Sequence, residues 1–268
     1  MQTPFGKVIS YCFFILFSSI SVAYSNETAR LCYEDEDYAP YLQGDTQQPA
    51  KPNPGVLVEI TQAAFKEAGQ KVQYIRRPWK RCMHLLRDGK IAGMFGVIHT
   101  KEREKIGKYP MQNGEIDSER RLLFVDYPIF RNADNATISW DGHKFSDPAP
   151  RIGTPLGYAT VKSLKKEHQI IPYTSFLPEQ GLKLVSEGKL DGYIVEKNVG
   201  LSILGKLDLK DKIIPHQPPF KRHALYLVLS HDFYEKNSKE AEKIWSTLAV
   251  LRKTVLDSIM KKYMHNIQ

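Results

Sequence analysis

The chain has 268 residues, a length that allows one large domain or two small ones. Apolar residues make up 42% of it, which is enough for a sizeable core. The formal charge is +8, but the lysines and arginines are spread among acids with no long basic arm. This pattern is typical of a solvated basic surface, leaves an anionic ligand open, and argues against nucleic acid as a partner.

Residues 1–25 have the organisation of a secretory signal peptide. Lys7 supplies a positive charge, a short apolar run interrupted by serines covers Val8–Val22, and Ala23-Tyr24-Ser25 has small residues where a signal peptidase needs them. The apolar run is shorter than the roughly 20 residues that a membrane span requires. We therefore expect cleavage near Ser25–Asn26, export, and a soluble mature protein.

Export changes how the cysteines are interpreted. After cleavage only Cys32 and Cys82 remain, an even pair in an oxidising compartment. A disulfide between them would close a loop of about 50 residues, which is worth roughly 4 kcal/mol in the chain-entropy model. It would join the first strand to the helix that starts at Pro78. The alternative is two buried free thiols, since cysteine is among the most buried residue types.

Short apolar strands alternate with amphipathic helices in the first half of the mature chain. The predicted strands cover residues 31–34, 72–75, 91–98 and 122–130, and the predicted helices cover residues 56–68 and 78–88. Pro78 suits the first helical position because its missing N–H would have no partner there, and Gly89 suits the stop. Residues 105–121 are charged and predict irregular structure. The alternation predicts a parallel sheet, with ligand residues at the carboxyl ends of its strands.

A second α/β series follows a loop-rich stretch at residues 132–150. The predicted strands cover residues 151–154, 170–173, 190–195, 213–214 and 224–229. The predicted helices cover residues 158–167, 178–187 and 197–204, with one or two further helices over residues 239–263. One sequence feature recurs in the two series. Gly89-Lys90-Ile91 and Gly188-Lys189-Leu190 each follow a helix and begin a buried strand whose third residue is glycine. This repeat indicates two lobes of similar α/β architecture.

The order and spacing of several short motifs resemble those of bacterial extracellular solute-binding proteins of family 3, which serve ABC importers of polar amino acids. The motifs are Tyr38-Ala39-Pro40-Tyr41, Gly55–Ile60, Pro78-Trp79-Lys80-Arg81, Gly89-Lys90-Ile91, Thr100-Lys101-Glu102-Arg103, Arg151-Ile152-Gly153 with Gly157, Gly188–Gly192 and Ala224–Ser230. No single motif is specific, but together they cover the mature chain.

The resemblance implies an α/β fold of the type II periplasmic-binding-protein kind. We expect a two-lobed clamp in which each lobe is a mainly parallel sheet flanked by helices, and in which two hinge strands join the lobes. The predicted first lobe comprises residues 26–121 and 220–268, and the predicted second lobe comprises residues 122–219. The resemblance further implies a periplasmic protein, a small-molecule ligand in the cleft and an ABC permease in the inner membrane as partner. We expect a monomer.

In the first lobe, the resemblance assigns the ligand's carboxylate to Arg103, since an arginine fork makes paired, charge-assisted hydrogen bonds to a carboxylate. Thr100 begins the same turn and is included in the predicted site. Trp79 would form an aromatic wall, and Tyr38 and Tyr41 would close the opposite side. The alternatives are a surface charge for Arg103, core packing for Trp79, and cover of the lobe surface for the tyrosines.

In the second lobe, the predicted ligand residues are Gly157, Tyr158, Ala159 and Glu196. The family often has hydroxyl residues after the glycine, which complete an anion cradle at a helix start. Here the backbone donors are kept but the first two hydroxyls are absent. Glu196 stands where amino-acid binders commonly place an aspartate that holds the ammonium group; the alternative is a surface carboxylate. Residues 96–98 also lack the serines often seen before the arginine motif. The implied ligand is an amino acid or related carboxylate without a named side chain.

Three functions fit this resemblance. The first is capture of a polar ligand for import, and the second is a sensing module for a receptor, which uses the same clamp. The third is an enzyme resembling cyclohexadienyl dehydratase, which needs a general acid or base in the cleft; His99 and Glu196 are the candidates. No metal-binding spacing, phosphate loop or nucleophile elbow is present, and the acids at 34–37 lack the spacing of a calcium loop. We therefore predict no metal and no cofactor, and we favour binding over catalysis.

Overall fold

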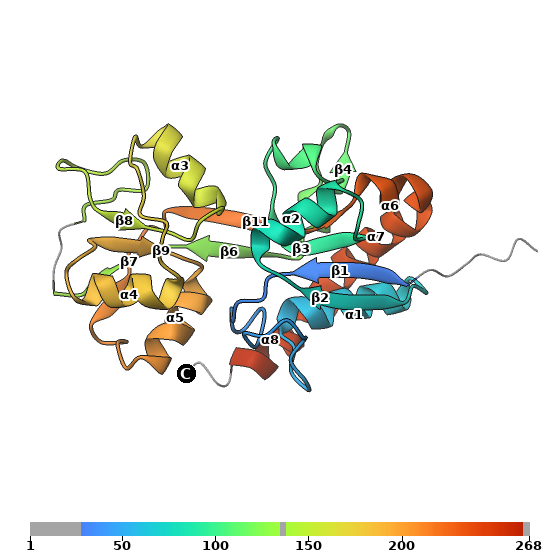
Figure 1. Cartoon of the computed structure of the whole chain (residues 1–268), viewed down its shortest axis with the longest axis horizontal. Helices are drawn as coiled ribbons and strands as arrows, with labels where there is room; N and C mark the ends of the chain where they lie inside the picture. The colour runs from blue at the N-terminus through green and yellow to red at the C-terminus, as the bar shows by residue number, and fades with distance from the viewer. Residues whose placement is uncertain (1–27, 135–137, 265–268) are drawn as a thin grey trace, which may run out of the picture.

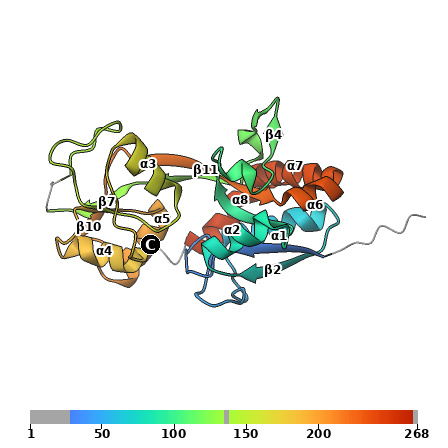
Figure 2. The same ribbon diagram turned by 45° about the horizontal axis from the view of Figure 1, so that its top comes forward.

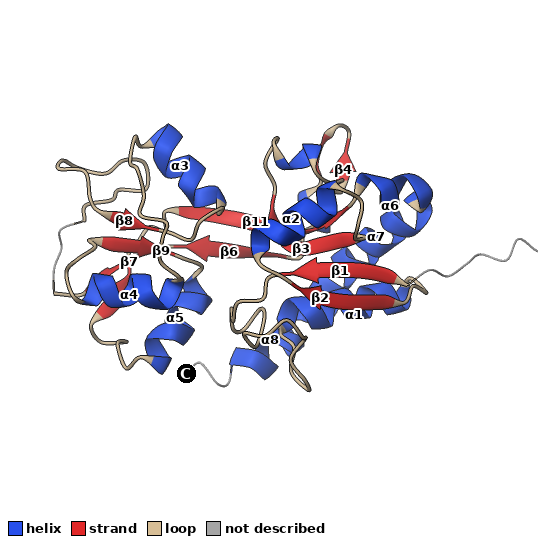
Figure 3. Ribbon diagram, viewed as in Figure 1, coloured by secondary structure: helices blue, strands red, loops and turns tan. Residues whose placement is uncertain are grey.

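The computed structural model describes residues 28–134 and 138–264. These residues form two lobes that lie side by side and are bridged by β-strands (Figure 1). Each lobe contains a main sheet flanked by helices (Figure 3). The predicted signal peptide lies outside the described residues. Within the described ranges, no helix combines the length and the apolar character that crossing a bilayer requires.

The first lobe is built on a five-stranded sheet with the order β2-β1-β3-β11-β6. Its strands are β1 (Ala29–Tyr33), β2 (Val72–Arg76), β3 (Gly93–Ile98), β6 (Leu123–Tyr127) and β11 (Lys221–Leu229). β1 pairs in parallel with β2 and β3, whereas β11 runs antiparallel to β3 and β6. β1 points toward the second lobe in Figure 1, so the carboxyl ends of the parallel strands face that lobe.

Helices cover both faces of this sheet. They are α1 (Val56–Glu67), α2 (Trp79–Arg87), α6 (His231–Lys236), α7 (Ser238–Thr254) and α8 (Leu256–Met264). Because side chains alternate along a strand, Leu31 and Tyr33 pack in the core that includes α1 and α7, while Cys32 packs on the opposite face against α2. Cys32 is joined there to Cys82 by a disulfide, with their Cα atoms 5.6 Å apart. The bridge ties the first strand to the helix that follows β2.

The second lobe is built on a four-stranded sheet with the order β10-β7-β9-β8. Its strands are β7 (Ile129–Asn132), β8 (Ile152–Gly153), β9 (Gly192–Ile194) and β10 (Ile213–Pro215), and its helices are α3 (Ala159–Glu167), α4 (Pro178–Ser186) and α5 (Lys197–Lys206). Gly153 and Gly181 make room for the ring of Tyr193, because a Cβ atom at either glycine would lie within 2.5 Å of that ring. The close approach packs α4 and β8 around β9.

The chain crosses between the lobes through β6 and β11, which pair with each other along the whole of β6. Figure 2 shows β11 spanning from one lobe to the other. The predicted strand at residues 122–130 is therefore two strands, β6 and β7, separated at Pro128. A proline has no N–H to donate, so it suits the point where the chain leaves one sheet for the next. The predicted lobe boundaries fall just before β6 and just before β11.

The sheets are mixed rather than mainly parallel, and this part of the prediction was wrong. In the first sheet β11 returns antiparallel, and in the second only β8 and β9 are parallel. The cause is the hinge: each crossing carries the chain straight from one lobe into the other without a returning helix. A parallel pair requires such a crossover.

Several element ends also differ from the prediction. Pro78 and Tyr158 are the N-cap residues of α2 and α3 rather than helical residues. The expected strand at residues 170–173 is reduced to one bridge between Tyr173 and Gly153. The stretch 239–263, for which one or two helices were expected, forms two, α7 and α8, which meet near Val255. Residues 105–121, expected to be irregular, include the short hairpin of β4 (Met111–Gln112) and β5 (Glu115–Ile116).

Candidate ligand-binding cleft

A cavity of about 70 Å³ lies where the two lobes meet. Most of its walls come from residues at or beyond the carboxyl ends of β1, β2, β3, β6, β8 and β9. Leu57 of α1, Phe95 and Gly96 within β3, and Leu225 of β11 complete them. The lining residues that the sequence predicted are Tyr38, Tyr41, Trp79, Arg103, Tyr158, Ala159 and Glu196. The cavity is small because side chains from the two lobes already touch across it.

Arg103 presents its guanidinium to this cavity from the turn after β3. Its Nη1 donates to the carbonyl of Ile98 at 2.9 Å, its Nη2 donates to the carbonyl of Gly157 at 3.3 Å, and its Cζ lies 5.6 Å from the Trp79 ring centre. Among the described residues no carboxylate forms an ion pair with it, and burial lowers its pKa. A cation held this way retains donors for a carboxylate from outside the chain.

Two other predicted residues support Arg103 without lining the cavity. Thr100 accepts the backbone N–H of Arg103 through both its carbonyl and its Oγ1, so it shapes the turn that carries the guanidinium. Gly157 contributes the carbonyl already described and has φ +86°, which favours glycine. It leads into Ala159, the first residue of α3, which does line the cavity. The N-terminus of α3 therefore lies next to the Arg103 guanidinium, across the boundary between the lobes.

Glu196 follows β9 and is the N-cap of α5. One carboxylate oxygen accepts the N–H of Val199 at 2.9 Å, and the other accepts the hydroxyl of Tyr41 at 3.2 Å. The residue is 6% exposed, and this burial raises its pKa to about 7 even though both hydrogen bonds favour the charged form. Glutamate is not a preferred N-cap residue, so helix capping alone does not explain its presence at this position.

Glu34 is a cavity residue that the sequence analysis missed. It directly follows β1, and its carboxylate accepts the hydroxyl of Tyr158 at 3.2 Å. Although part of its surface meets the cavity, burial raises its pKa to about 8, and the charges of Glu36 and Asp35 add to the effect. The available signal was its place at the carboxyl end of a predicted strand. Glu34 is the first of four consecutive acids, residues 34–37, and this run does not show which of the four carboxylates faces the cavity.

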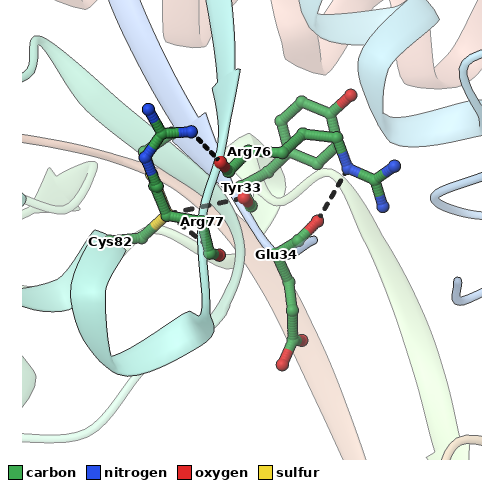
Figure 4. Close-up of a disulfide and its surroundings, with 6 residues drawn as sticks. Tyr33, Glu34, Arg76, Arg77 and Cys82 are labelled. Carbon is green, nitrogen blue, oxygen red and sulfur yellow. Dashed lines mark hydrogen bonds between the residues drawn. A yellow bond between two sulfur atoms is a disulfide. The ribbon is translucent and has the colours of Figure 1, made fainter. Parts of the chain in front are cut away.

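A buried arginine fixes the segment that carries Glu34. Arg76, at the end of β2, has no exposed surface, and its guanidinium donates to four backbone carbonyls. These carbonyls belong to Glu34, Glu36, Gln43 and Gly44. Figure 4 shows the guanidinium beside the Glu34 backbone while the Glu34 carboxylate extends in another direction. The carboxylate is thereby left to face the cavity.

The aromatic residues form a continuous group over the cavity. Tyr158 from the second lobe lies between Trp79 and Tyr38 of the first, with ring centres 6.4 Å and 6.3 Å away. The rings supply apolar surface and faces that attract a cation.

His99 does not take part in this arrangement. Its Nε2 lies 2.7 Å from a carboxylate oxygen of Glu104, its ring packs edge-on against Tyr109, and it does not line the cavity. Within the described ranges, no group of three His, Cys, Asp or Glu residues could hold a metal ion.

A scan of protein-family models and a search of curated proteins each find no match. Solved structures, in contrast, match over most of the chain. A histidine kinase sensor domain with similarity to periplasmic binding proteins is 17% identical, with a TM-score of 0.69 over 89% of this chain and 96% of its own. The arginine-, lysine-, histidine-binding protein ArtJ of Geobacillus stearothermophilus is 14% identical, with a TM-score of 0.67 over 89% and 96%.

An ancestral amino-acid-binding protein, a precursor of cyclohexadienyl dehydratase, is 18% identical, with a TM-score of 0.63 over 88% of this chain and 95% of its own. At such identities the likeness shows the fold. The predicted resemblance to solute-binding proteins is thus confirmed at the level of the two-lobed clamp.

Proposed function

We propose that this protein is a periplasmic solute-binding protein that captures an amino acid or related small carboxylate between its lobes and delivers it to an ABC importer. The observation that carries the proposal is the Arg103 guanidinium, which lines an interlobe cavity and has no carboxylate partner among the residues that the structure describes. Desolvated cations of this kind are costly unless a ligand pairs with them. Closure would then be driven by contacts that the ligand makes only when both lobes reach it.

The test is a thermal-shift screen of the exported protein against amino acids, small organic acids and polyamines. A ligand at 100 times its dissociation constant adds about 2.7 kcal/mol to the free energy of unfolding. We expect Arg103→Ala to abolish the shift for a carboxylate ligand. Arg87→Ala, which removes an exposed arginine from α2, serves as the matched control and leaves the shift intact. An equal shift in both variants would remove Arg103 from the site.

Sensing is a second candidate, favoured by the likeness to a kinase sensor domain. The same clamp serves both functions, so the discriminating measurement concerns the partner. Uptake of the ligand by vesicles that contain an inner-membrane permease, stimulated by the loaded protein, supports import. Stimulation of a receptor kinase by the loaded protein supports sensing instead.

Catalysis is the third candidate, favoured by two cavity carboxyl groups, Glu34 and Glu196, whose raised pKa values suit general acids. His99, the other acid–base candidate, does not line the cavity. A product assay on each ligand found in the screen separates the alternatives. Recovery of the ligand unchanged supports binding, whereas turnover that Glu34→Gln or Glu196→Gln abolishes would establish an enzyme.

A further inference from the structure

The charged groups of the cavity do not balance. Its wall contains one guanidinium, that of Arg103, and two carboxylates, those of Glu34 and Glu196. None of these three groups forms an ion pair with another. The guanidinium of the nearby Arg76 donates its hydrogen bonds to backbone carbonyls. Without a ligand, the cavity therefore holds one more ionisable acid than base.

The two carboxylates are arranged in a matching way on opposite lobes. Glu34 of the first lobe accepts the hydroxyl of Tyr158 from the second, and Glu196 of the second lobe accepts the hydroxyl of Tyr41 from the first. Each acid thus meets a neutral donor at the point where the lobes touch. An ammonium or guanidinium group can donate to the same oxygens and adds an opposite charge, which a hydroxyl cannot do.

The surroundings of Glu34 and Glu196 differ, and this difference indicates which cationic group of a ligand each acid would bind. Glu196 lies at the start of α5 and takes a backbone N–H, so it already has a fixed orientation. Glu34 lies beside the rings of Tyr38 and Tyr158, and its neighbours Glu36 and Asp35 are acidic. Aromatic faces and surrounding negative charge suit the cation at the end of a long side chain.

We propose that the cleft selects a basic amino acid, with its carboxylate on Arg103, its α-ammonium on Glu196 and its side-chain cation on Glu34. This inference rests on the proposed function and adds the class of ligand to it. The ligand carries one negative and two positive groups, which complement the two negative groups and the one positive group of the wall. A neutral amino acid of equal size leaves the Glu34 carboxylate desolvated, with the Tyr158 hydroxyl but no cation as its partner, which is the arrangement that gives strong discrimination.

The experiment is isothermal titration calorimetry at pH 7.5 with two matched ligand pairs, arginine with citrulline and lysine with norleucine. We expect at least one basic ligand to bind about 100-fold more tightly than its neutral partner. In Glu34→Gln the ratio should fall below about 10, chiefly through weaker binding of the basic ligand. Glu115→Gln makes the same change at an exposed glutamate of β5 that does not line the cavity, and should keep the wild-type ratio. Circular dichroism checks that each variant is folded.

The outcomes separate the two proposals. Tight binding of citrulline, norleucine or another neutral or acidic amino acid, with no preference for a basic one, would overturn the inference and leave the proposed function standing. An unchanged ratio in Glu34→Gln would overturn the role of Glu34. Absence of binding by every amino acid and small carboxylate in the screen would overturn the proposed function itself.

Discussion

The two walls of the cleft are held in place differently. The first-lobe wall consists of segments that follow β1, β2 and β3, and these are fixed from behind by the buried Arg76 and by the disulfide between β1 and α2. The second-lobe wall consists of the first turns of α3 and α5, with Tyr158 and Glu196 as their N-cap residues. Much of the hydrogen bonding of those two side chains comes from the opposite lobe. We therefore expect the first wall to be formed before closure, and closure to complete the second.

The side chains of the two acids do not follow the difference between the backbones that carry them. Glu196 accepts a backbone N–H of its own helix, a bond that favours its charged form, and its pKa reaches about 7. Glu34 receives the hydroxyl of Tyr158 but is repelled by Glu36 and Asp35, and its pKa reaches about 8. A preformed wall lowers the entropy lost when a ligand binds, so defects in it should be more damaging than defects in the closing wall.

The largest effect is expected when the support of the first wall is removed. Arg76→Met keeps the buried aliphatic stem but leaves the carbonyls of residues 34, 36, 43 and 44 without their donor. We expect urea unfolding to show a loss of about 3 kcal/mol, since buried carbonyls without partners cost about 1–3 kcal/mol each and some will meet water. Arg87→Met, on the exposed face of α2, should change stability little. Equal stability of the two variants would mean that Arg76 is not the support of this wall.

How much of this site the sequence revealed depends on the kind of contact. Trp79 and Arg103 could be found because each lies in a motif of the resemblance. Glu196 could be found because it follows a predicted strand at the position where such proteins commonly place an aspartate. Arg76 could not, because a strand-end arginine is normally exposed, and the carbonyls that bury it come from a loop with no periodic pattern. Glu34 was hidden for a related reason: in four consecutive acids, only the tertiary structure decides which one turns inward.

The fold shows the same limit. The alternation of strands and helices predicted both lobes and most helices, since hydrophobic periodicity is a local property. It did not predict that the segment 122–130 is divided at Pro128, or that β11 returns antiparallel, because strand pairing joins residues distant in sequence. The bulge in β3 is a further example. Gly96, with φ +76°, is the unpaired residue there, and its position follows from pairing with β11.

A smaller effect is expected from pH, and it sharpens the contrast between the two acids. The pKa of Glu34 rises from an ordinary value near 4.5 to about 8 in the folded protein. The neutral form is thus favoured by folding, so the stabilisation is fully present below pH 4.5 and is lost as the pH rises through 8. We expect the ligand-free protein to lose about 2 kcal/mol between pH 5 and pH 8.5, less than the full shift implies because the lobes can open.

Thermal unfolding of the ligand-free protein across this range measures the loss. Glu34→Gln, which cannot ionise, should flatten the profile more than Glu196→Gln, because the pKa of Glu34 is raised further. Glu115→Gln, at an exposed glutamate outside the cavity wall, should leave the wild-type slope. A profile that Glu34→Gln does not flatten would show that Glu34 is hydrated in the empty protein and does not face a desolvated cavity.

The smallest effect is expected from the crossed tyrosine bonds, which act on lobe closure rather than on folding. Tyr158→Phe removes the donor to Glu34, and Tyr41→Phe removes both the donor to Glu196 and the acceptor of the Asn198 amide. Each hydrogen bond is worth about 1 kcal/mol, so each variant should shift the open–closed equilibrium of the empty protein about fivefold toward the open form. Tyr41→Phe should shift it slightly more.

Small-angle scattering detects opening as a larger radius of gyration. Tyr173→Phe, at an exposed tyrosine of the second lobe, is the control. If both variants stay as compact as the control, the second wall is held by something other than the first, and the distinction between a preformed wall and a closing wall fails.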